Sequence, residues 1–433
     1  MTSLNFQIAP AVQATEAPPI PKAQAWGCQY MPSPSAPLLD LSQGVPRDAP
    51  HPSILAALSQ AASDPKTARY GPILGEPGLR QALAQEIKVQ YFLLGQEVTS
   101  EDVAITTGCN MAFLSLLMTL CPPGKSTVLL PLPAYFNHTM SLSLQDVNPV
   151  YVPCEPDNMF KASLPFAKSY LASLKKESGD RREPRMIVLV SPSNPTGTVY
   201  TSDEIKLWDF VEGESGERGL PHRLFEEPDW RSTLVSLGSF SKGYRIPGHR
   251  LGSIIASPEL LSHITTICDC MQICPPRPPQ IALTPLLPSL RPDLLAASSQ
   301  LSYRRHLFKT TVNSVSGWKV ISSGGFFAYV QFPEDYIYAS SILGLKRKKL
   351  GSEDVARVLA LRCGVVTLPG SFFMPFVADD EQWDNILDCE TLRQDKWLRF
   401  AVANVEDDVV LSLGPRLKLM NKIMGVENED VTQ

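Results

Sequence analysis

Apolar residues are arranged in two patterns along the chain, continuous runs and repeats at helical spacing. Segments 103–107 and 127–130 are continuous runs of apolar and β-branched residues, which are typical of short strands buried in a parallel sheet. Elsewhere apolar residues return at helical spacing, as Leu79, Leu83 and Ile87 do after the sequence Gly-Glu-Pro. Strands that alternate with helices predict an α/β domain with a mainly parallel sheet.

This alternation continues as far as a Pro-rich stretch that ends near residue 292, so we place the large domain at residues 66–295. A capping box between Thr201 and Glu204 predicts the start of a further helix within it. The other elements expected in this domain are strands at 149–152, 186–190 and 233–238 and a buried helix at 111–120.

The rest of the chain predicts a second, smaller α+β domain at residues 296–433, with residues 38–65 as its N-terminal part. Its expected elements are an antiparallel-looking run, a helix and a final strand, at 324–332, 353–362 and 398–403. Residues 1–37 are rich in Pro, Ala and Gln and have weak periodicity, so they predict an extended or disordered arm.

Composition narrows the function. The net charge of −5 gives the chain no excess of basic residues for binding nucleic acid. No apolar run reaches the length of a membrane-spanning helix, and the start of the sequence lacks a signal-peptide pattern, so we expect a cytoplasmic protein without a membrane partner. The nine cysteines are spaced irregularly, and the group of His263, Cys268, Cys270 and Cys274 matches no common zinc pattern, so we expect no metal.

One segment carries an unusual set of side chains, SFSKGYRIPGHRLG at 239–252. It offers a hydroxyl at Ser239, an amine at Lys242 and a guanidinium at Arg250. Arg250 can pair with a phosphate through two hydrogen bonds, and Ser239 can donate to the same group. Nearby positive charge and desolvation favour the neutral amine that imine formation requires. The set therefore suits a phosphate-bearing aldehyde.

The spacing of Ser239, Lys242 and Arg250 resembles the cofactor-lysine segment of fold-type I aminotransferases of class I and II, which bind pyridoxal 5′-phosphate (PLP). The resemblance implies an enzyme that transfers an amino group between an amino acid and a 2-oxo acid, with Lys242 forming the internal aldimine. Three further family motifs occur in the family's order: TTGCN at 106–110, PLPAYFNH at 131–138 and SPSNPTG at 191–197.

The same resemblance implies a set of cofactor-binding residues besides those of the lysine segment. Backbone amides of Gly108, Cys109 and Asn110 at a helix start would hold the phosphate, because such amides point at a bound anion. Tyr135 would stack on the pyridine ring, and Asn194 would donate to the phenolic oxygen of the cofactor.

Substrate and partner residues are implied in the same way. Arg399 in KWLRFAVA would grip the substrate α-carboxylate, which a guanidinium can bind through two hydrogen bonds. Asn194 would help to orient the substrate, and Gly44 in LSQGVP would bring the backbone close to it. Tyr70 in ARYGPILGEPGLR would reach across a dimer interface to the partner's phosphate, so the resemblance implies a homodimer.

One strand of the family is missing from the sequence near 211–232. Family members have a strand here that ends in Asp-x-x-Tyr, and its Asp pairs with the pyridinium nitrogen. This segment has no run of four apolar residues and no such motif, and Asn194 lies only 48 positions before Lys242 (242 − 194). The acids nearby, Glu226, Glu227 and Asp229, stand in a polar loop that contains Pro228.

Two other functions therefore remain open. A lyase similar to aminocyclopropane-carboxylate synthase would share these motifs. A PLP-binding pseudoenzyme with little activity would account for the missing acid. The sequence does not identify the amino acid or the oxo acid.

Overall fold

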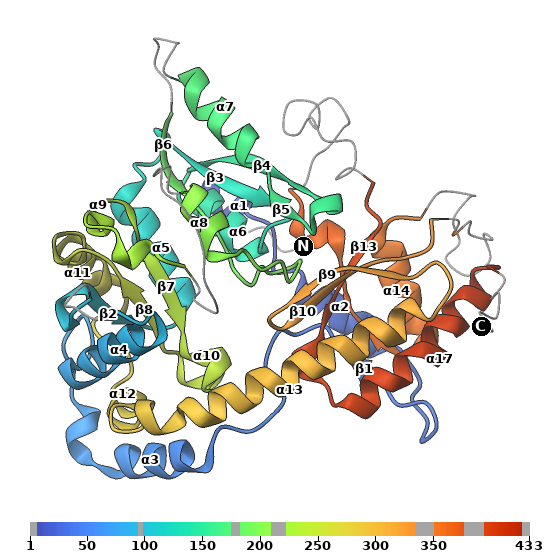
Figure 1. Cartoon of the computed structure of the whole chain (residues 1–433), viewed down its shortest axis with the longest axis horizontal. Helices are drawn as coiled ribbons and strands as arrows, with labels where there is room; N and C mark the ends of the chain where they lie inside the picture. The colour runs from blue at the N-terminus through green and yellow to red at the C-terminus, as the bar shows by residue number, and fades with distance from the viewer. Residues whose placement is uncertain are drawn as a thin grey trace. The chain divides into compact units, whose positions relative to one another are not determined.

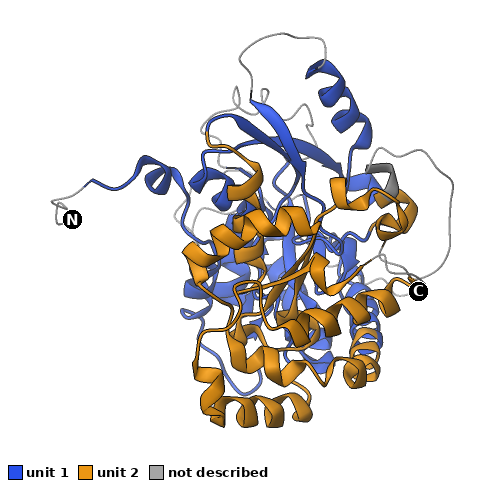
Figure 2. Cartoon of the chain, turned by 90° about the vertical axis from the view of Figure 1, so that its left-hand side faces the viewer, with its two compact units in different colours: residues 1–47, 124–199, 299–433 blue, residues 48–123, 200–298 orange. Residues whose placement is uncertain are grey.

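The computed structural model describes residues 7–93, 98–174, 182–208, 222–334, 336, 350–375 and 394–426. The chain forms two compact units, which Figure 2 colours separately. Unit 1 consists of residues 1–47, 124–199 and 299–433, and unit 2 consists of residues 48–123 and 200–298. The long helix α13 (Leu287–Asn313), labelled in Figure 1, contributes residues to both units. The domain bounds given above stay a prediction.

The first sheet of unit 1 contains the parallel strands that the apolar runs predict. β3 lies between β4 and β6 and runs parallel to both, while β5 pairs antiparallel with β4. β3 is almost wholly buried because residues 128–130 are all apolar. The elements of this sheet and its helices are β3 (Ser126–Leu132), α6 (Phe136–Leu144), β4 (Asn148–Glu155), β5 (Lys161–Ala162), α7 (Leu164–Leu174) and β6 (Glu183–Ile187).

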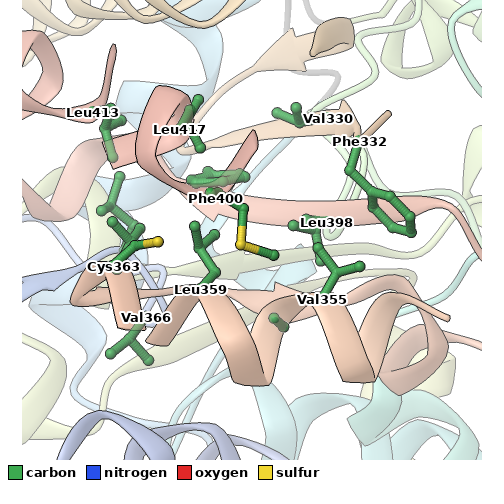
Figure 3. Packing of buried hydrophobic residues seen from close by; sticks show 14 of the residues in the cluster. Val330, Phe332, Val355, Leu359, Cys363, Val366, Leu398, Phe400, Leu413 and Leu417 are labelled. Carbon is green, nitrogen blue, oxygen red and sulfur yellow. The ribbon is translucent and has the colours of Figure 1, made fainter. Parts of the chain in front are cut away.

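The second sheet of unit 1 is antiparallel, in the order β12-β13-β10-β9. Figure 3 shows Leu359 and Cys363, from α14, in one buried cluster with Leu398 and Phe400, from β13. The elements around this cluster are β9 (Lys319–Gly324), β10 (Phe327–Gln331), α14 (Ser352–Cys363), β12 (Leu368–Pro369), β13 (Trp397–Ala401) and α17 (Asp407–Ile423). A separate, short parallel pair, β1 (Leu39–Asp40) with β11 (Val365–Val366), also adds residues to the buried cluster.

The N-terminal residues differ from the expected arm. They include two helices, α1 (Pro10–Ala14) and α2 (Ile20–Gly27). Ala23 and Trp26 of α2 are buried in the main core of unit 1, because the helix turns both side chains to the same side. Weak periodicity concealed this helix, since it buries only one short face.

Unit 2 is built on a three-stranded sheet in the order β2-β8-β7, with β8 antiparallel to both neighbours. The predicted strand 103–107 and the predicted buried helix 111–120 are confirmed as β2 and α5. The main elements of unit 2 are α3 (Pro52–Ser63), α4 (Pro77–Gln90), β2 (Val103–Thr106), α5 (Cys109–Leu120), α8 (Ser202–Trp208), β7 (Ser236–Ser239), β8 (Gly252–Ile255), α11 (Pro258–Gln272) and α12 (Arg277–Leu283).

Each of the two sheets that carry family motifs ends in a half-exposed strand. β2 and β8 are buried throughout, whereas residues 236–238 of β7 are only half-buried. β6 stands last in its own sheet and ends at Ile187, so it covers only the first part of the predicted strand 186–190, whose residues are half-buried too. The prediction that segment 233–238 is a buried strand is therefore wrong in its burial, because β8 is the one strand that pairs with β7 among the described residues.

Residues 222–233 form a short anchored segment and no strand. They contain the 3-10 turn η4 (Leu224–Glu226) and the one-turn helix α9 (Trp230–Thr233). Phe225 and Trp230 are buried in the core of unit 2, so the segment is less polar in its contacts than its sequence suggested. The described part of 211–232 thus lacks the family strand, and residues 209–221 lie outside the described ranges. Within those ranges no helix is long and apolar enough to cross a membrane.

Candidate active site

Three chain segments that carry the predicted phosphate-binding residues meet at one end of the unit 2 sheet. Gly252 at the start of β8 pairs with Thr106 at the end of β2 on one side and with Ser239 at the end of β7 on the other. The antiparallel register therefore brings the TTGCN turn and the lysine segment to the same edge. Sequence spacing had suggested these motifs separately, and the sheet places them side by side.

Gly108 shapes the turn between β2 and α5. Its backbone has φ +81°, which favours glycine, and a Cβ there would clash with Nη2 of Arg250. Gly252 also lies close to this turn, because a Cβ on it would stand 2.5 Å from the backbone nitrogen of Cys109. Gly108 thus lets the Arg250 guanidinium approach the N-terminus of α5, and Gly252 lets the start of β8 approach the backbone there.

The electrostatics of this corner suit an anion. The first turn of α5 presents backbone N–H groups and the positive end of the helix dipole, and Arg250 adds a full positive charge beside them. Burial raises the pKa of the Cys109 thiol, whereas the charge of Arg250 lowers it. The residues present therefore fit a phosphate dianion, which is the group that the sequence assigned to Gly108, Cys109, Asn110 and Arg250.

Ser239 and Lys242 lie directly after β7. Ser239 caps the one-turn helix α10 (Phe240–Gly243), where its Oγ accepts a hydrogen bond from the Ser241 backbone nitrogen at 3.3 Å. Lys242 stands in that turn with an exposed side chain. Phe240 and Ser241 are buried, so the turn is anchored while the amine side chain stays accessible. Tyr70, also in unit 2, is 80% exposed.

In unit 1, Arg399 is a deeply buried cation. It lies on β13 with 2% of its surface exposed. Its Nη1 donates to Oδ1 of Asn194 at 2.9 Å, and its Nη2 donates to the backbone oxygen of Ser42. The guanidinium carbon stands 4.6 Å from the ring centre of Phe327 and 5.1 Å from that of Phe373. Arg399 and Asn194, which the sequence assigned to one substrate, are therefore in contact.

The charge of Arg399 lacks an acidic partner among the described residues, and its Nε makes no hydrogen bond there. Burial lowers the pKa of Arg399 to about 9, while the phenols of Tyr135 and Tyr329 act in the opposite direction. A buried cation with a free donor is costly unless an anion binds to it. The site in unit 1 is thus suited to a carboxylate.

Asn194 is held by a turn that sits on the β9–β10 hairpin. The backbone nitrogen of Gly197 donates to the Ser193 oxygen at 2.8 Å, and Ser322 Oγ donates to the Thr196 oxygen at 2.6 Å. Gly197 has φ +70°, and a Cβ there would stand 2.6 Å from the Gly324 nitrogen. The Asn-Pro-Thr-Gly sequence therefore fits this close approach of two backbones.

Gly44 and Tyr135 complete the predicted residues of unit 1. A Cβ at Gly44 would clash with the ring of Phe327, which also meets Arg399, and the approach of the Gly44 backbone to the substrate stays a prediction. Tyr135 stands at the N-cap of α6, and its ring meets that of His138 edge-on at 5.4 Å. The stacking role of Tyr135 stays a prediction.

Sequence reasoning missed three contributors to the Arg399 environment. The backbone oxygen of Ser42 gave no signal, since any residue can supply it. Phe327 and Phe373 belong to the segments GGFFAYV and VVTLPGSFF, to which the sequence gave no chemical role. The available signal was the pair of phenylalanines in GGFFAYV, a predicted strand that becomes β10 and pairs with β13.

Comparison with known proteins identifies the family. The family model "Aminotransferase class I and II" matches residues 36–413, which is most of the chain. The chain belongs to the class I and II aminotransferases. These enzymes depend on PLP, so the chain is a PLP-dependent aminotransferase that transfers an amino group.

Several aminotransferases have similar sequences. The aspartate aminotransferase of Sulfurisphaera tokodaii is 26% identical over 72% of this chain and 76% of its own length. The aromatic aminotransferase ISS1 of Arabidopsis thaliana is 30% identical over 54% of this chain and 60% of its own. A putative aminotransferase of Rhizobium meliloti, AatC, is 25% identical over 86% and 88%. These names do not favour the lyase or the pseudoenzyme.

Solved structures support the aminotransferase fold. The aspartate aminotransferase from Rhizobium meliloti has a TM-score of 0.77 at 18% identity, covering 96% of this chain and 99% of that one. Bna3p from Saccharomyces cerevisiae, described as a putative kynurenine aminotransferase, has a TM-score of 0.76 at 19% identity, with coverages of 96% and 99%. The predicted fold class is thus confirmed.

Proposed function

We propose that this aminotransferase carries PLP on Lys242 and binds the cofactor phosphate at the start of α5. The row of Thr106, Gly252 and Ser239 is the observation that carries the proposal, because it brings the two phosphate-binding motifs to one sheet edge. The Gly108 turn leaves room for the Arg250 guanidinium at the same place. A phosphate dianion there would meet backbone donors, a hydroxyl and a cation.

When bound, PLP supplies an electron sink for the carbanion that forms as the substrate loses its Cα proton. The Lys242 amine would then serve as the general base that takes this proton from Cα and as the acid that gives it to C4′ of the cofactor. An accessible side chain on an anchored turn suits both roles, since the amine must first hold the cofactor and later move.

Arg399 and Asn194 orient the amino acid or 2-oxo acid through its α-carboxylate. The guanidinium is buried between aromatic rings, so a carboxylate bound to it is poorly screened by water. Asn194 accepts from Arg399 through Oδ1, which turns its Nδ2 donors away from the guanidinium and toward another acceptor. Gly44 lets the backbone approach this place, and Tyr135 would cover the cofactor ring.

Borohydride reduction of the PLP-loaded protein tests the central assignment. Peptide mapping should place the pyridoxyl adduct on Lys242, and Lys242→Ala should abolish it, while Lys88→Ala on α4 should leave it unchanged. An adduct on another lysine of the folded wild type contradicts the proposal.

The proposal extends to a cytoplasmic homodimer in which Tyr70 completes the phosphate site of the partner subunit. The 80% exposure of this side chain supports it, since a large aromatic side chain at such a place suits contact with another surface. Mixing Tyr70→Phe chains with Lys242→Ala chains tests the arrangement. If Tyr70 acts in trans, each heterodimer keeps one intact site and recovers activity, whereas no recovery argues for action within the same subunit.

A further inference from the structure

The exposed side chain of Tyr70 projects from a loop whose backbone is fixed on both sides. The loop starts at the 3-10 turn η1 (Pro65–Ala68), where Thr67 Oγ1 donates to the Ala61 oxygen at 2.9 Å. After Tyr70, the Gly71 nitrogen donates to Sγ of Cys274 at 3.4 Å. Tyr70 itself is 80% exposed. A rigid base thus carries one outward-pointing aromatic side chain.

Arg277, at the start of α12, joins the two sides of this loop. Its Nη1 donates to the backbone oxygen of Lys66 at 2.7 Å and to that of Arg69 at 3.1 Å. Its Nε donates to the Glu76 carboxylate at 2.5 Å. One guanidinium therefore spans residues before and after Tyr70, as a planar fork of five donors can and a lysine ammonium cannot.

The stem of Arg277 packs where Gly71 leaves space. A Cβ on Gly71 would stand 2.9 Å from Cδ of Arg277 and 2.9 Å from Oε1 of Glu76. Arg277 and Glu76 are both largely buried, with 19% and 18% of their side chains exposed. Water therefore screens this ion pair less than it screens a surface pair.

Gln280 fixes the Glu76 end of the Arg277–Glu76 pair. Its Oε1 accepts from the Glu76 nitrogen at 2.7 Å, and its Nε2 donates to the backbone oxygens of Pro275 and Pro276 at 3.0 and 2.9 Å. Gln280 is 1% exposed. The support of the loop is thus a connected and buried hydrogen-bond network, which has few alternative arrangements.

We infer that Arg277 is a positioning residue, which holds the 66–71 loop so that Tyr70 is preset to reach a phosphate group on a second copy of this chain. The inference rests on the role proposed for Tyr70. A preorganised loop matters because a flexible loop would lose conformational entropy on reaching the partner. It would then bind the partner's phosphate group more weakly.

Binding of PLP and of pyridoxal, which lacks the phosphate, tests the inference on the dimeric protein. Tyr70→Phe should weaken PLP binding about tenfold, as expected for loss of one hydrogen bond to a charged group, and leave pyridoxal binding unchanged. Arg277→Ala should weaken PLP binding several-fold in the wild type. In the Tyr70→Phe background it should change PLP binding less than about twofold, because a residue that acts through Tyr70 has nothing left to position.

Two variants control for general damage. Arg291→Ala removes a comparable pair, in which Arg291 binds Glu86 through hydrogen bonds of 2.6 and 2.8 Å in the same unit, and it should leave PLP binding unchanged. Arg277→Lys keeps the charge beside Glu76 but loses the fork, so it should restore only part of the PLP affinity.

The outcomes distinguish the role proposed for Tyr70 from the positioning role inferred for Arg277. If Tyr70→Phe leaves PLP binding unchanged, the role proposed for Tyr70 is wrong and the inference falls with it. If Tyr70→Phe weakens binding but Arg277→Ala has no effect, or has an equal effect in both backgrounds, only the inference is overturned. An equal loss of pyridoxal binding in Arg277→Ala also overturns it, because the phosphate is then not involved.

Discussion

Arg231 holds the carboxylate of Asp102 through two parallel hydrogen bonds, from Nε to Oδ1 at 2.6 Å and from Nη2 to Oδ2 at 2.8 Å. Asp102 is buried just before β2, and Thr99 donates to it from both its backbone nitrogen and its hydroxyl. Arg231 belongs to the segment in which the family strand is missing. This pair ties that segment to the core of unit 2 and accounts for its ordered path into β7.

Arg231→Ala should lower the free energy of unfolding by about 1–3 kcal/mol. Loss of the guanidinium leaves the buried Asp102 carboxylate with fewer hydrogen-bond donors. Because 37% of the Arg231 side chain is exposed, the loss of stability should be smaller than for a fully buried pair. Urea unfolding measures it. Arg47→Ala breaks an exposed pair with Glu406 and should change stability by less than about 0.5 kcal/mol. Equal effects of the two variants would refute the anchoring role.

His138 should make the protein sensitive to mild acid. Burial lowers the pKa of the His138 imidazole from 6.5 to about 4. The unfolded chain therefore binds a proton between these values that the folded chain does not bind, and stability falls as the pH drops from about 6.5 to about 4. The contribution of His138 is at most about 3 kcal/mol. Urea unfolding at several pH values should show a shallower slope for His138→Gln than for wild type, and an unchanged slope would contradict the assignment.

Arg399→Lys should weaken substrate binding and leave the PLP content near that of wild type. Lysine keeps a positive charge but loses the planar fork that binds Asn194, Ser42 and a carboxylate together. The loss should exceed about tenfold in KM or kcat/KM, because a buried bidentate pair is replaced by a single contact. Absorbance of the bound cofactor and steady-state kinetics separate the two quantities. A loss of PLP with unchanged KM would reverse the assignment.

Several parts of this fold could be predicted because one residue pattern decided them. Val128 to Leu130 favour a buried strand, and Leu79 with Ile87 defines the inner face of α4. The capping box was also readable, since Thr201 and Glu204 exchange hydrogen bonds of 2.7 and 3.2 Å. Such local signals do not depend on distant partners.

Other features depend on contacts between segments far apart in the chain. The burial of Trp26 depends on a core made by distant elements. The exposure of β7 depends on the second neighbouring strand that it lacks within the described ranges. The rings of Phe327 and Phe373 meet Arg399 only after three segments have packed together. The family resemblance supplied the residue roles that periodicity could not.

The two half-exposed sheet ends bear directly on catalysis. β6 and β7 are each last in their own sheet, and both carry apolar residues such as Ile187 and Leu237 that are only half-buried. A terminal strand leaves one row of backbone N–H and C=O groups without sheet partners. In the family, the acid that pairs with the cofactor's ring nitrogen stands on a strand that the described part of 211–232 lacks. Of the acids in the described segment, Glu226 and Asp229 are exposed at the surface of unit 2.

We therefore expect PLP to bind through Lys242 and the phosphate-binding groups while turnover stays below the usual range for enzymes, on the order of 1–1000 per second. Inserting an apolar strand that ends in Asp-x-x-Tyr between His222 and Arg223 should raise both thermal stability and kcat. The strand would give backbone groups partners, at about 1–3 kcal/mol for each buried group that was unsatisfied, and the Asp would hold the ring-nitrogen proton.

A matched insertion that ends in Asn-x-x-Tyr separates these two effects, because it restores the strand without the acid. It should raise stability as much as the Asp insertion and raise kcat far less. If the unmodified protein already turns over within the usual range, the missing carboxylate is replaced locally or is not required. In that event Glu226→Gln, Glu227→Gln and Asp229→Asn are the variants to measure first, since these acids lie between the missing strand and Lys242 in the chain.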